Sequence, residues 1–270
     1  MARAARGVTT IGPRELLTEL VDAVGGGHPV VLATIVGTDG SVPRHAGAKM
    51  VVHPDGTTTG TIGGGEVESL VRDEALAALK DRRPRLRRYT LNDPELGDPG
   101  VCGGTMTIYL EPYMTPRTVY VVGAGHVGRS VVDLADWLGY RTVVVDDRDD
   151  LVTEEAMPNA SVRFAGSVQN ALAEHPADET TAVVVVTRSH ELDAQIVPIL
   201  LETPTPYIGV MGSKRRWATT RDVLIDQGVT EQALERVHVP IGLSIGAETV
   251  EEIAVSIMSE VIASAAASDE

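Results

Sequence analysis

One glycine-rich turn, placed between an apolar strand and a helix, constrains the fold of this chain more than any other feature. The sequence Val-Tyr-Val-Val at residues 119–122 is followed by glycines at positions 123, 125 and 128. In this spacing Gly123 permits a tight turn, Gly125 lets a pyrophosphate approach the backbone, and Gly128 lets the helix pack closely against the strand. The N–H groups at the start of the helix, including that of Val127, would bind the phosphate. The pattern therefore predicts a Rossmann-type dinucleotide-binding fold.

The end of the next expected strand supports this interpretation. Asp146 comes 18 residues after Gly128, at the position where a carboxylate binds a ribose hydroxyl in such folds. An acid there disfavours a 2′-phosphate, so NAD-like or FAD-like ligands are expected ahead of NADP. His126 follows the second glycine directly, and two roles stay open for it. It either contacts a ligand phosphate or takes part in catalysis, or it makes a local hydrogen bond at the helix end.

Strands and helices alternate through the whole second half of the chain. The expected strands are 119–122, 142–145, 162–165, 181–186 and 206–210, and the expected helices are 126–138, 192–202, 215–227 and 248–263. This alternation predicts right-handed crossovers and a parallel sheet. Aromatic residues make up only 3% of the chain, with a single Phe, so the cores must be aliphatic, which suits a parallel sheet buried on both faces.

The first half of the chain has a different pattern and predicts a smaller α+β domain. A helix is expected from Pro13, strands at 29–36, 49–53 and 107–111, and a helix at 66–80 after a glycine run. The predicted fold class is thus α/β, with a C-terminal Rossmann-like doubly wound parallel sheet and a smaller N-terminal α+β domain. The predicted boundaries are flexible ends at 1–12 and 265–270, domains at 13–112 and 118–264, and a linker at 113–117.

Charge and cysteine content exclude several classes of function. The net charge of −15 opposes binding to nucleic acid and to anionic membrane surfaces. The arginine-rich run 82–88 is interpreted as a solvated helix end and loop. Because Cys102 is the single cysteine, no intrachain disulfide can form, which fits a reducing compartment. No signal peptide or membrane-spanning run is found, and a cytoplasmic location is expected.

Several separate motifs, in order along nearly the whole chain, resemble those of the XdhC/CoxI family of xanthine dehydrogenase and CO dehydrogenase maturation factors. The motifs are Ala33-Thr34-Ile35-Val36, Gly40-Ser41-Val42-Pro43-Arg44, Gly47-Ala48-Lys49-Met50, Gly60-Thr61-Ile62-Gly63-Gly64-Gly65 with Glu68, Cys102-Gly103-Gly104, Gly123-Ala124-Gly125-His126-Val127 with Asp146-Asp147-Arg148, Tyr207-Ile208-Gly209-Val210-Met211-Gly212-Ser213-Lys214, and Pro240-Ile241-Gly242-Leu243 through Ile245-Gly246-Ala247. One departure is Glu66, where many relatives carry a cysteine, and another is Arg188, where relatives often have a histidine.

The resemblance implies a chaperone that binds molybdenum cofactor, as molybdopterin or its cytosine dinucleotide, and protects it while a sulfur is added. The implied partners are an apo molybdenum hydroxylase and a cysteine-desulfurase-type sulfur donor. This reading makes the chain an accessory protein rather than an enzyme. The fingerprint and Asp146 support an alternative, an NAD(P)-dependent oxidoreductase acting on an unknown small substrate, with His126 or His190 as proton donor.

The N-terminal half holds further candidate site residues, each with a structural alternative. The run Gly63-Gly64-Gly65 before a helix would bind an anion, unless Glu66 and Glu68 satisfy that helix end themselves. Arg44 would clamp a phosphate, assisted by Lys49. Cys102 is a candidate contact to molybdenum or acceptor of sulfur, and its alternative is a small buried side chain.

Two features of the C-terminal half also stay open. Ser213 and Lys214 follow the fifth expected strand. In one interpretation both close over the cofactor, and in the other Ser213 caps the next helix while Lys214 stays solvated. The apolar stripe of the final helix, residues 251–263, either forms a homo-oligomer or packs on its own sheet.

Overall fold

The computed structural model describes residues 12–25, 27–91 and 103–267. The chain divides into two units, which we call the N-terminal unit (Met1–Thr115) and the C-terminal unit (Pro116–Glu270). The division falls within residues 113–117. The strand before it continues to Tyr113, and the final helix continues to Ala267. Each unit has its own core of buried aliphatic residues.

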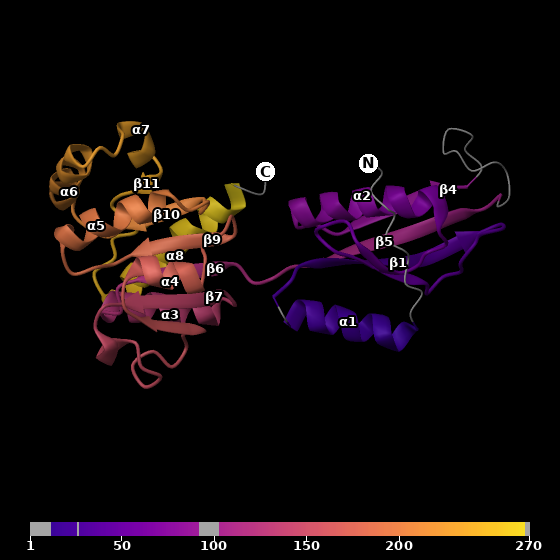
Figure 1. Ribbon diagram of the computed structural model, residues 1–270, viewed down its shortest axis with the longest axis horizontal. Coiled ribbons are helices and arrows are strands. Elements are labelled where there is room, and N and C mark those ends of the chain that lie inside the picture. Colours follow the sequence, from indigo (N-terminus) through magenta and orange to yellow (C-terminus); the bar gives the residue numbers. More distant parts are fainter. Residues whose placement is uncertain (1–11, 26, 92–102, 268–270) are drawn as a thin grey trace. The chain divides into compact units, whose positions relative to one another are not determined.

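The N-terminal unit is one antiparallel sheet with a helix on each face (Figure 1). Its elements are α1 (Pro13–Gly25), β1 (Val30–Asp39), β2 (Lys49–Val52), β3 (Thr58–Gly60), α2 (Gly65–Asp81), β4 (Arg85–Thr90) and β5 (Thr105–Tyr113). The strand order is β3-β2-β1-β5-β4. Successive strand residues point to opposite faces, so Val30 and Leu32 of β1 pack with Leu16 of α1, while Val31 and Ala33 pack with α2.

The arginine-rich run 82–88 differs from its predicted helix end and loop. Most of it is β4, an edge strand that pairs antiparallel with β5. Arg85 and Arg87 lie two apart on the strand, so both reach the same face, where each donates a hydrogen bond of 2.9 Å to Glu74 of α2. The prediction of a loop was wrong because these cross-element ion pairs have no signature in local sequence.

The C-terminal unit is a doubly wound sheet of six parallel strands (Figure 1). Its elements are β6 (Thr118–Val122), α3 (His126–Trp137), β7 (Arg141–Asp146), a 3-10 turn (Asp149–Leu151), β8 (Val162–Ala165), α4 (Val168–Glu174), β9 (Thr181–Val185), α5 (His190–Leu201), β10 (Tyr207–Val210), α6 (Lys214–Asp226), α7 (Glu231–Leu234), β11 (Val237–His238) and α8 (Val250–Ala267). The strand order is β11-β10-β9-β6-β7-β8. The predicted fold class is confirmed.

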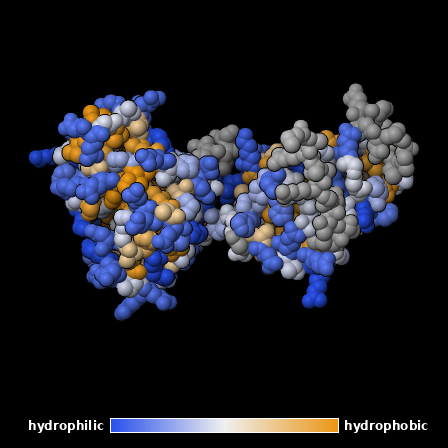
Figure 2. Space-filling model, in the orientation of Figure 1, coloured by the Kyte–Doolittle hydropathy of each residue, from blue (hydrophilic) through white to orange (hydrophobic). Residues whose placement is uncertain are grey.

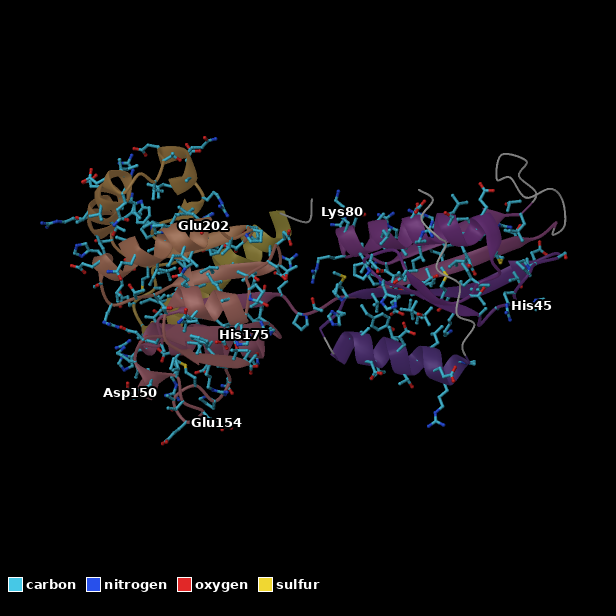
Figure 3. The ribbon with its side chains drawn as sticks, viewed as in Figure 1. His45, Lys80, Asp150, Glu154, His175 and Glu202 are labelled. Atoms are coloured by element: carbon cyan, nitrogen blue, oxygen red, sulfur yellow. The ribbon has the colours of Figure 1, made fainter. Side chains whose placement is uncertain are left out.

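The two faces of this sheet are covered by different helices. Aliphatic residues of α3 and α8 form one core with the sheet, and those of α4, α5 and α6 form the other. The apolar stripe of the final helix therefore packs on its own sheet, through Ala254, Ile257, Met258 and Val261. Charged side chains such as those of Asp150 and Glu154 point outward into solvent (Figure 3).

The strand order places a topological switch point between β6 and β9. From β6 the chain winds one way to β7 and β8, and then the other way to β9, β10 and β11. In open parallel sheets of this kind, ligands bind in the crevice at the carboxyl ends of the strands on either side of such a point. The turn from β6 into α3 lies at that position. No helix in the described part of the chain is long and apolar enough to span a bilayer.

Candidate functional site

Two of the three fingerprint glycines are required by the fold itself. Gly123 has a φ of 113°, and a Cβ there would lie 2.6 Å from the carbonyl oxygen of Val186. A Cβ on Gly128 would overlap the carbonyl oxygen of Gly123, so no larger residue can stand at this point of α3. These glycines bring the helix close to β6, as the spacing predicts.

Gly125 differs because nothing in the described protein requires it to be glycine. Its φ of −72° suits any residue, and no heavy atom lies within 4 Å of the position that a Cβ would take. Gly125 is also the N-cap of α3, and no side chain accepts a hydrogen bond there. By contrast, Ser167, Ser189 and Ser213 cap α4, α5 and α6. The start of α3 thus offers backbone donors beside open space, which is the arrangement that an anion needs.

The side chain of His126, the first residue of α3, is exposed and has no hydrogen-bond partner among the described residues. The local hydrogen bond considered as its structural alternative is therefore not formed. A role for His126 toward a ligand stays a prediction.

Asp146, at the end of β7, is buried and held by its own protein. Its Oδ2 accepts a hydrogen bond of 2.7 Å from the N–H of Ala124 and another from Arg148, while its Oδ1 accepts two more from Arg148. Burial opposes the charge, but the hydrogen bonds from Arg148 and Ala124 outweigh it, and the pKa of Asp146 lies below its ordinary value. The expected contact with a ribose hydroxyl would require Arg148 to move, because a carboxylate has about four acceptor sites.

A second ion pair joins the strands on either side of β6. Arg188, after β9, donates two hydrogen bonds of 2.7 Å to the two carboxylate oxygens of Asp147, after β7. Arg188 holds the pKa of Asp147 well below its usual range. Because β6 lies between β7 and β9, this bidentate pair crosses the switch point of the sheet.

A pocket of about 350 Å³ lies beside the glycine turn. The carboxyl ends of β6 and β7 contribute Val122, Gly123 and Asp146, and α5 contributes an aliphatic wall. Asp147, Arg148 and Arg188 also line it. The sequence analysis named Arg148 only as part of a motif and Arg188 only as a departure from relatives. Their positions just after the ends of β7 and β9, the two strands that flank β6, were the available signal.

The glycine run before α2 is held internally. Glu68 Oε1 accepts hydrogen bonds from Thr61 Oγ1 at 2.5 Å, from the N–H of Ile62 at 3.0 Å and from the N–H of Gly64 at 2.9 Å. The N–H of Gly63 donates to Thr61 Oγ1. Glu68 of the first turn therefore holds the run ahead of α2, while Gly64, the N-cap of α2, has no side-chain cap hydrogen bond among the described residues. Anion binding by Gly63, Gly64 and Gly65 stays a prediction.

Arg44 and Lys49 line a separate hollow of about 230 Å³ in the N-terminal unit, together with Gly60 and Thr61. Neither cation forms an ion pair with any carboxylate in the described ranges. Glu66 is exposed. Cys102 lies outside the described residues, so its predicted contact with molybdenum stays a prediction.

Ser213 caps α6, because its Oγ accepts a hydrogen bond of 3.2 Å from the N–H of Arg216. Lys214 is exposed. Arg216 instead reaches the buried carboxylate of Asp193 and the hydroxyl of Thr187. This network links Thr187, which follows β9, and Asp193 of α5 to Arg216 of α6, the helix after β10. No local pattern in the sequence indicated it.

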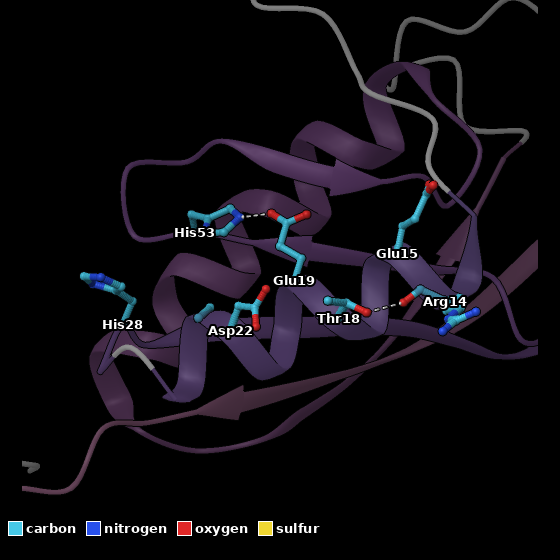
Figure 4. A pocket seen from close by; sticks show the side chains of 8 residues that line it. Arg14, Glu15, Thr18, Glu19, Asp22, His28 and His53 are labelled. Atoms are coloured by element: carbon cyan, nitrogen blue, oxygen red, sulfur yellow. Dashed lines mark hydrogen bonds and ion pairs between the residues drawn. The ribbon is translucent and has the colours of Figure 1, made fainter.

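Another hollow of the N-terminal unit, about 800 Å³, lies over α1 (Figure 4). Glu19 of α1 accepts a hydrogen bond from Thr59, and its Oε1 lies 2.9 Å from Nε2 of His53. No group of three or more metal-binding side chains occurs among the residues that the structure describes. This hollow contains none of the predicted site residues.

Comparison with known proteins identifies both halves of the chain. Residues 119–261 match the XdhC Rossmann domain, and residues 23–90 match the XdhC and CoxI family. YqeB of Escherichia coli K12 is 36% identical over 87% of this chain, and the molybdenum cofactor insertion chaperone PaoD of the same organism is 25% identical over 92% of it.

The matches differ in how much of each relative they cover. The alignment spans 43% of the length of YqeB and 87% of the length of PaoD. A crystal structure of a xanthine dehydrogenase from Bacillus halodurans has a TM-score of 0.50 and 23% identity, covering 92% of this chain and 95% of that one. At that identity the likeness concerns the fold alone.

Proposed function

The chain belongs to the XdhC and CoxI family, and from this premise we propose that it is a chaperone that binds molybdenum cofactor and inserts it into an apo molybdenum hydroxylase of the xanthine dehydrogenase or CO dehydrogenase type. The name of PaoD supports the proposal, because that relative is a molybdenum cofactor insertion chaperone aligned over most of both chains. In this role the chain is an accessory protein rather than an enzyme.

The observation that carries the proposal is the free start of α3. Among the described residues, no side chain caps the N–H groups after Gly125, and none fills the space that a Cβ would take at Gly125. A phosphate group of the cofactor fits such a cradle, because the helix end contributes both hydrogen-bond donors and a favourable dipole. Gly123, Gly125, His126, Val127 and Gly128 would hold it.

Predicted residues of the N-terminal unit form a candidate anion site of their own. Arg44 and Lys49 bring two cations, neither paired with a carboxylate of the described residues, to one hollow, and each would bind a phosphate oxygen or another anionic group. Gly63, Gly64, Gly65 and Glu68 border the same region through Thr61. When bound, the cofactor would supply the molybdenum centre that the client needs.

Sulfuration of the cofactor is a finer part of the proposal. A cysteine-desulfurase-type partner would donate the sulfur, and Cys102 would accept it or contact the metal. Glu66 stands where many relatives carry a thiol, which leaves Cys102 as the one thiol of the chain for this chemistry.

The rival proposal is an NAD(P)-dependent oxidoreductase, and the switch-point geometry favours it as a second candidate. The strand order is that of dinucleotide-binding sheets. Against it, the acceptor positions of Asp146 are taken by Arg148 and Ala124. A ribose hydroxyl would have to displace a buried ion pair, and truncating or separating such pairs is costly.

Molybdenum retention tests the proposal. The full chain is purified from a host that makes the cofactor, and bound molybdenum is measured by mass spectrometry alongside the fluorescence of released pterin. The wild-type protein is expected to carry molybdenum, and Gly125→Asp is expected to lose it, because a carboxylate at that open position repels a phosphate.

Gly25→Asp provides a matched control, since Gly25 ends α1 and also has no heavy atom within 4 Å of its Cβ position. It should retain molybdenum. Absence of molybdenum from the wild-type protein, with NADH binding instead, would favour the oxidoreductase. Transfer is then followed as activity gained by an apo hydroxylase on mixing with the loaded protein.

A further inference from the structure

The ion pair between Arg188 and Asp147 crosses the end of the strand from which the glycine turn starts. On one side of the turn, the N–H of Gly123 donates a hydrogen bond of 2.8 Å to the carbonyl oxygen of Val145 in β7. On the other side, a Cβ on Gly123 would lie 2.6 Å from the carbonyl oxygen of Val186, just after β9. Neighbouring strands lie about 4.8 Å apart, so a pair that joins residues after β7 and β9 must pass the carboxyl end of β6 between them.

The two ion pairs that line the adjacent pocket differ in how firmly they hold their arginines. Asp146, the partner of Arg148, has a side chain that is 3% exposed, and it also accepts hydrogen bonds from two backbone N–H groups. Asp147, the partner of Arg188, has a side chain that is 53% exposed, and that of Arg188 is 47% exposed. Breaking a buried pair is costly, whereas an exposed pair contributes little to stability. Arg188 is therefore the guanidinium group that can leave its carboxylate for a ligand.

Little else in the pocket competes for this cation. Among the described residues that line the pocket, the charged ones are the four members of these two pairs. The wall contributed by α5 is aliphatic and consists of Leu192, Ile196 and Ile199. In Figure 2 apolar side chains lie among hydrophilic ones on the side of the unit where Figure 1 places α4 and α5. Because Arg148 and Ala124 take the acceptor positions of Asp146, an Arg188 released from Asp147 is left for an anion that enters from solvent.

We infer that Arg188 is a further phosphate-binding residue of the site at the start of α3, and that Asp147 competes with the ligand for it. The inference rests on the proposed function. In the structure Asp147 accepts both hydrogen bonds of Arg188, and once the turn holds a phosphorylated ligand, Arg188 donates them to phosphate oxygens instead. Guanidinium binds carboxylate and phosphate through the same two parallel hydrogen bonds, and a pyrophosphate carries more negative charge than one carboxylate.

This competition gives a chaperone a means of releasing its ligand. Arg188 adds affinity while the phosphate is bound, and the carboxylate of Asp147 takes the arginine back as the ligand leaves. The net affinity is therefore lower than Arg188 alone would give. A lower affinity favours transfer to a client over permanent retention.

A double-mutant cycle, measured as binding of inorganic pyrophosphate to the full chain by isothermal titration at constant ionic strength, tests the inference. Arg188→Gln is expected to weaken binding about tenfold, the factor that corresponds to about 1.4 kcal/mol. Asp147→Asn removes the competitor and is expected to tighten binding about fivefold. In the Arg188→Gln background the same Asp147→Asn change should alter binding by less than about twofold, because no arginine remains to be released.

Glu231→Gln is the matched control. Glu231 of α7 pairs with Arg221 of α6, so its substitution removes one exposed, paired carboxylate and changes the net charge equally, but it does not line the pocket. It should leave pyrophosphate binding within about twofold of the wild type. Arg188→Lys keeps the charge without the paired hydrogen bonds, and its affinity should lie between those of the wild type and Arg188→Gln. Thermal unfolding of every variant checks that a change in binding does not reflect a loss of structure.

The outcomes separate this inference from the proposed function. A gain from Asp147→Asn that persists in the Arg188→Gln background, or an equal gain from Glu231→Gln, would reveal charge repulsion alone and overturn the inference. Unchanged binding in Arg188→Gln, or a wild-type protein that retains molybdenum without binding pyrophosphate, would overturn it as well and leave the chaperone proposal standing. Failure of every variant to bind pyrophosphate, together with a wild-type protein that carries no molybdenum, would remove both.

Discussion

The turn at residues 63–65 and the turn at residues 123–125 each lead into a helix whose N-cap is a glycine, and neither N-cap has a side-chain hydrogen bond. They differ in what the protein itself places against them. In the N-terminal unit, Glu68 accepts from the N–H groups of Ile62 and Gly64. In the C-terminal unit, Asp146 takes the N–H of Ala124. Among the described residues, the first-turn donors of both helices lack a side-chain cap.

The backbone of the two turns differs as well. Gly63, Gly64 and Gly65 all have positive φ, so glycine is needed there for conformation alone. Gly125 has a negative φ and open space at its Cβ position, so its identity has no conformational cause. The two turns thus differ in why they contain glycine. The described fold does not require glycine at position 125, which indicates a ligand, whereas the positive φ of residues 63–65 and the hydrogen bonds to Glu68 indicate a structural turn.

The largest expected effect comes from Gly128→Ala. A Cβ there overlaps the carbonyl oxygen of Gly123, so the helix must shift away from β6, at a cost of about 3 kcal/mol in the free energy of unfolding. Both tryptophans of the chain, Trp137 and Trp217, belong to the C-terminal unit, so urea unfolding followed by tryptophan fluorescence reports on this unit. An unfolding midpoint equal to that of the wild type would contradict the close packing of α3 against β6 at Gly128.

A smaller loss is expected from Glu68→Ala. The change leaves the N–H groups of Ile62 and Gly64 without their acceptor and should lower the stability of the N-terminal unit by about 2 kcal/mol. Far-UV circular dichroism measures the loss, while the tryptophan transition serves as the internal control and should not move. If pyrophosphate binding fell along with stability, the turn at 63–65 would have to be counted as part of the phosphate site.

The variants Gly64→Ala and Gly125→Ala compare the two turns directly. Neither Cβ meets a heavy atom within 4 Å, but Gly64 has a φ of 80°, which costs an L-residue about 1 kcal/mol. Gly125→Ala should leave the unfolding midpoint unchanged and weaken pyrophosphate binding, whereas Gly64→Ala should do the reverse. The contrast between the turns fails if the two variants behave alike in both measurements.

The smallest expected effect is a dependence of the melting temperature on pH below about pH 5. Because the pKa of Asp146 is lowered in the folded state, its contribution to stability is complete above its unfolded pKa of about 4 and is lost as the pH falls through the folded value. The melting temperature of the wild type, followed by tryptophan fluorescence, should fall more steeply than that of Asp146→Asn between about pH 5 and pH 3. Parallel curves for the two proteins would show that Asp146 is not held as described.

Sequence reasoning recovered the features that are local and periodic. Strand β8 matches the prediction at both ends, and the helix start at His126 follows from the glycine spacing. The edge strand β4 was missed, because its arginines are satisfied by Glu74, a residue on another element. Short elements such as α7 and β11, four and two residues long, carry too little periodicity to be recognised.

The residues of the candidate site also divide into those that a local pattern indicated and those that it did not. The glycines were found because their spacing is a local pattern. The partners of Asp146 were not, because a sequence shows that a carboxylate is present and not what occupies its acceptor positions. The pairing of Asp147 with Arg188 joins residues 41 positions apart, and the link from Arg216 to Asp193 spans 23. Such contacts depend on the strand order, which local patterns do not specify.

Amide chemical shifts of the isotope-labelled full chain, recorded during a titration with inorganic pyrophosphate, test the central claim most directly. The amide signals of Gly125, His126 and Val127 should move in a saturable way, while those of Gly63, Gly64 and Gly65 stay in place. Shifts confined to residues 63–65, or no saturable shift at the start of α3, would contradict the account.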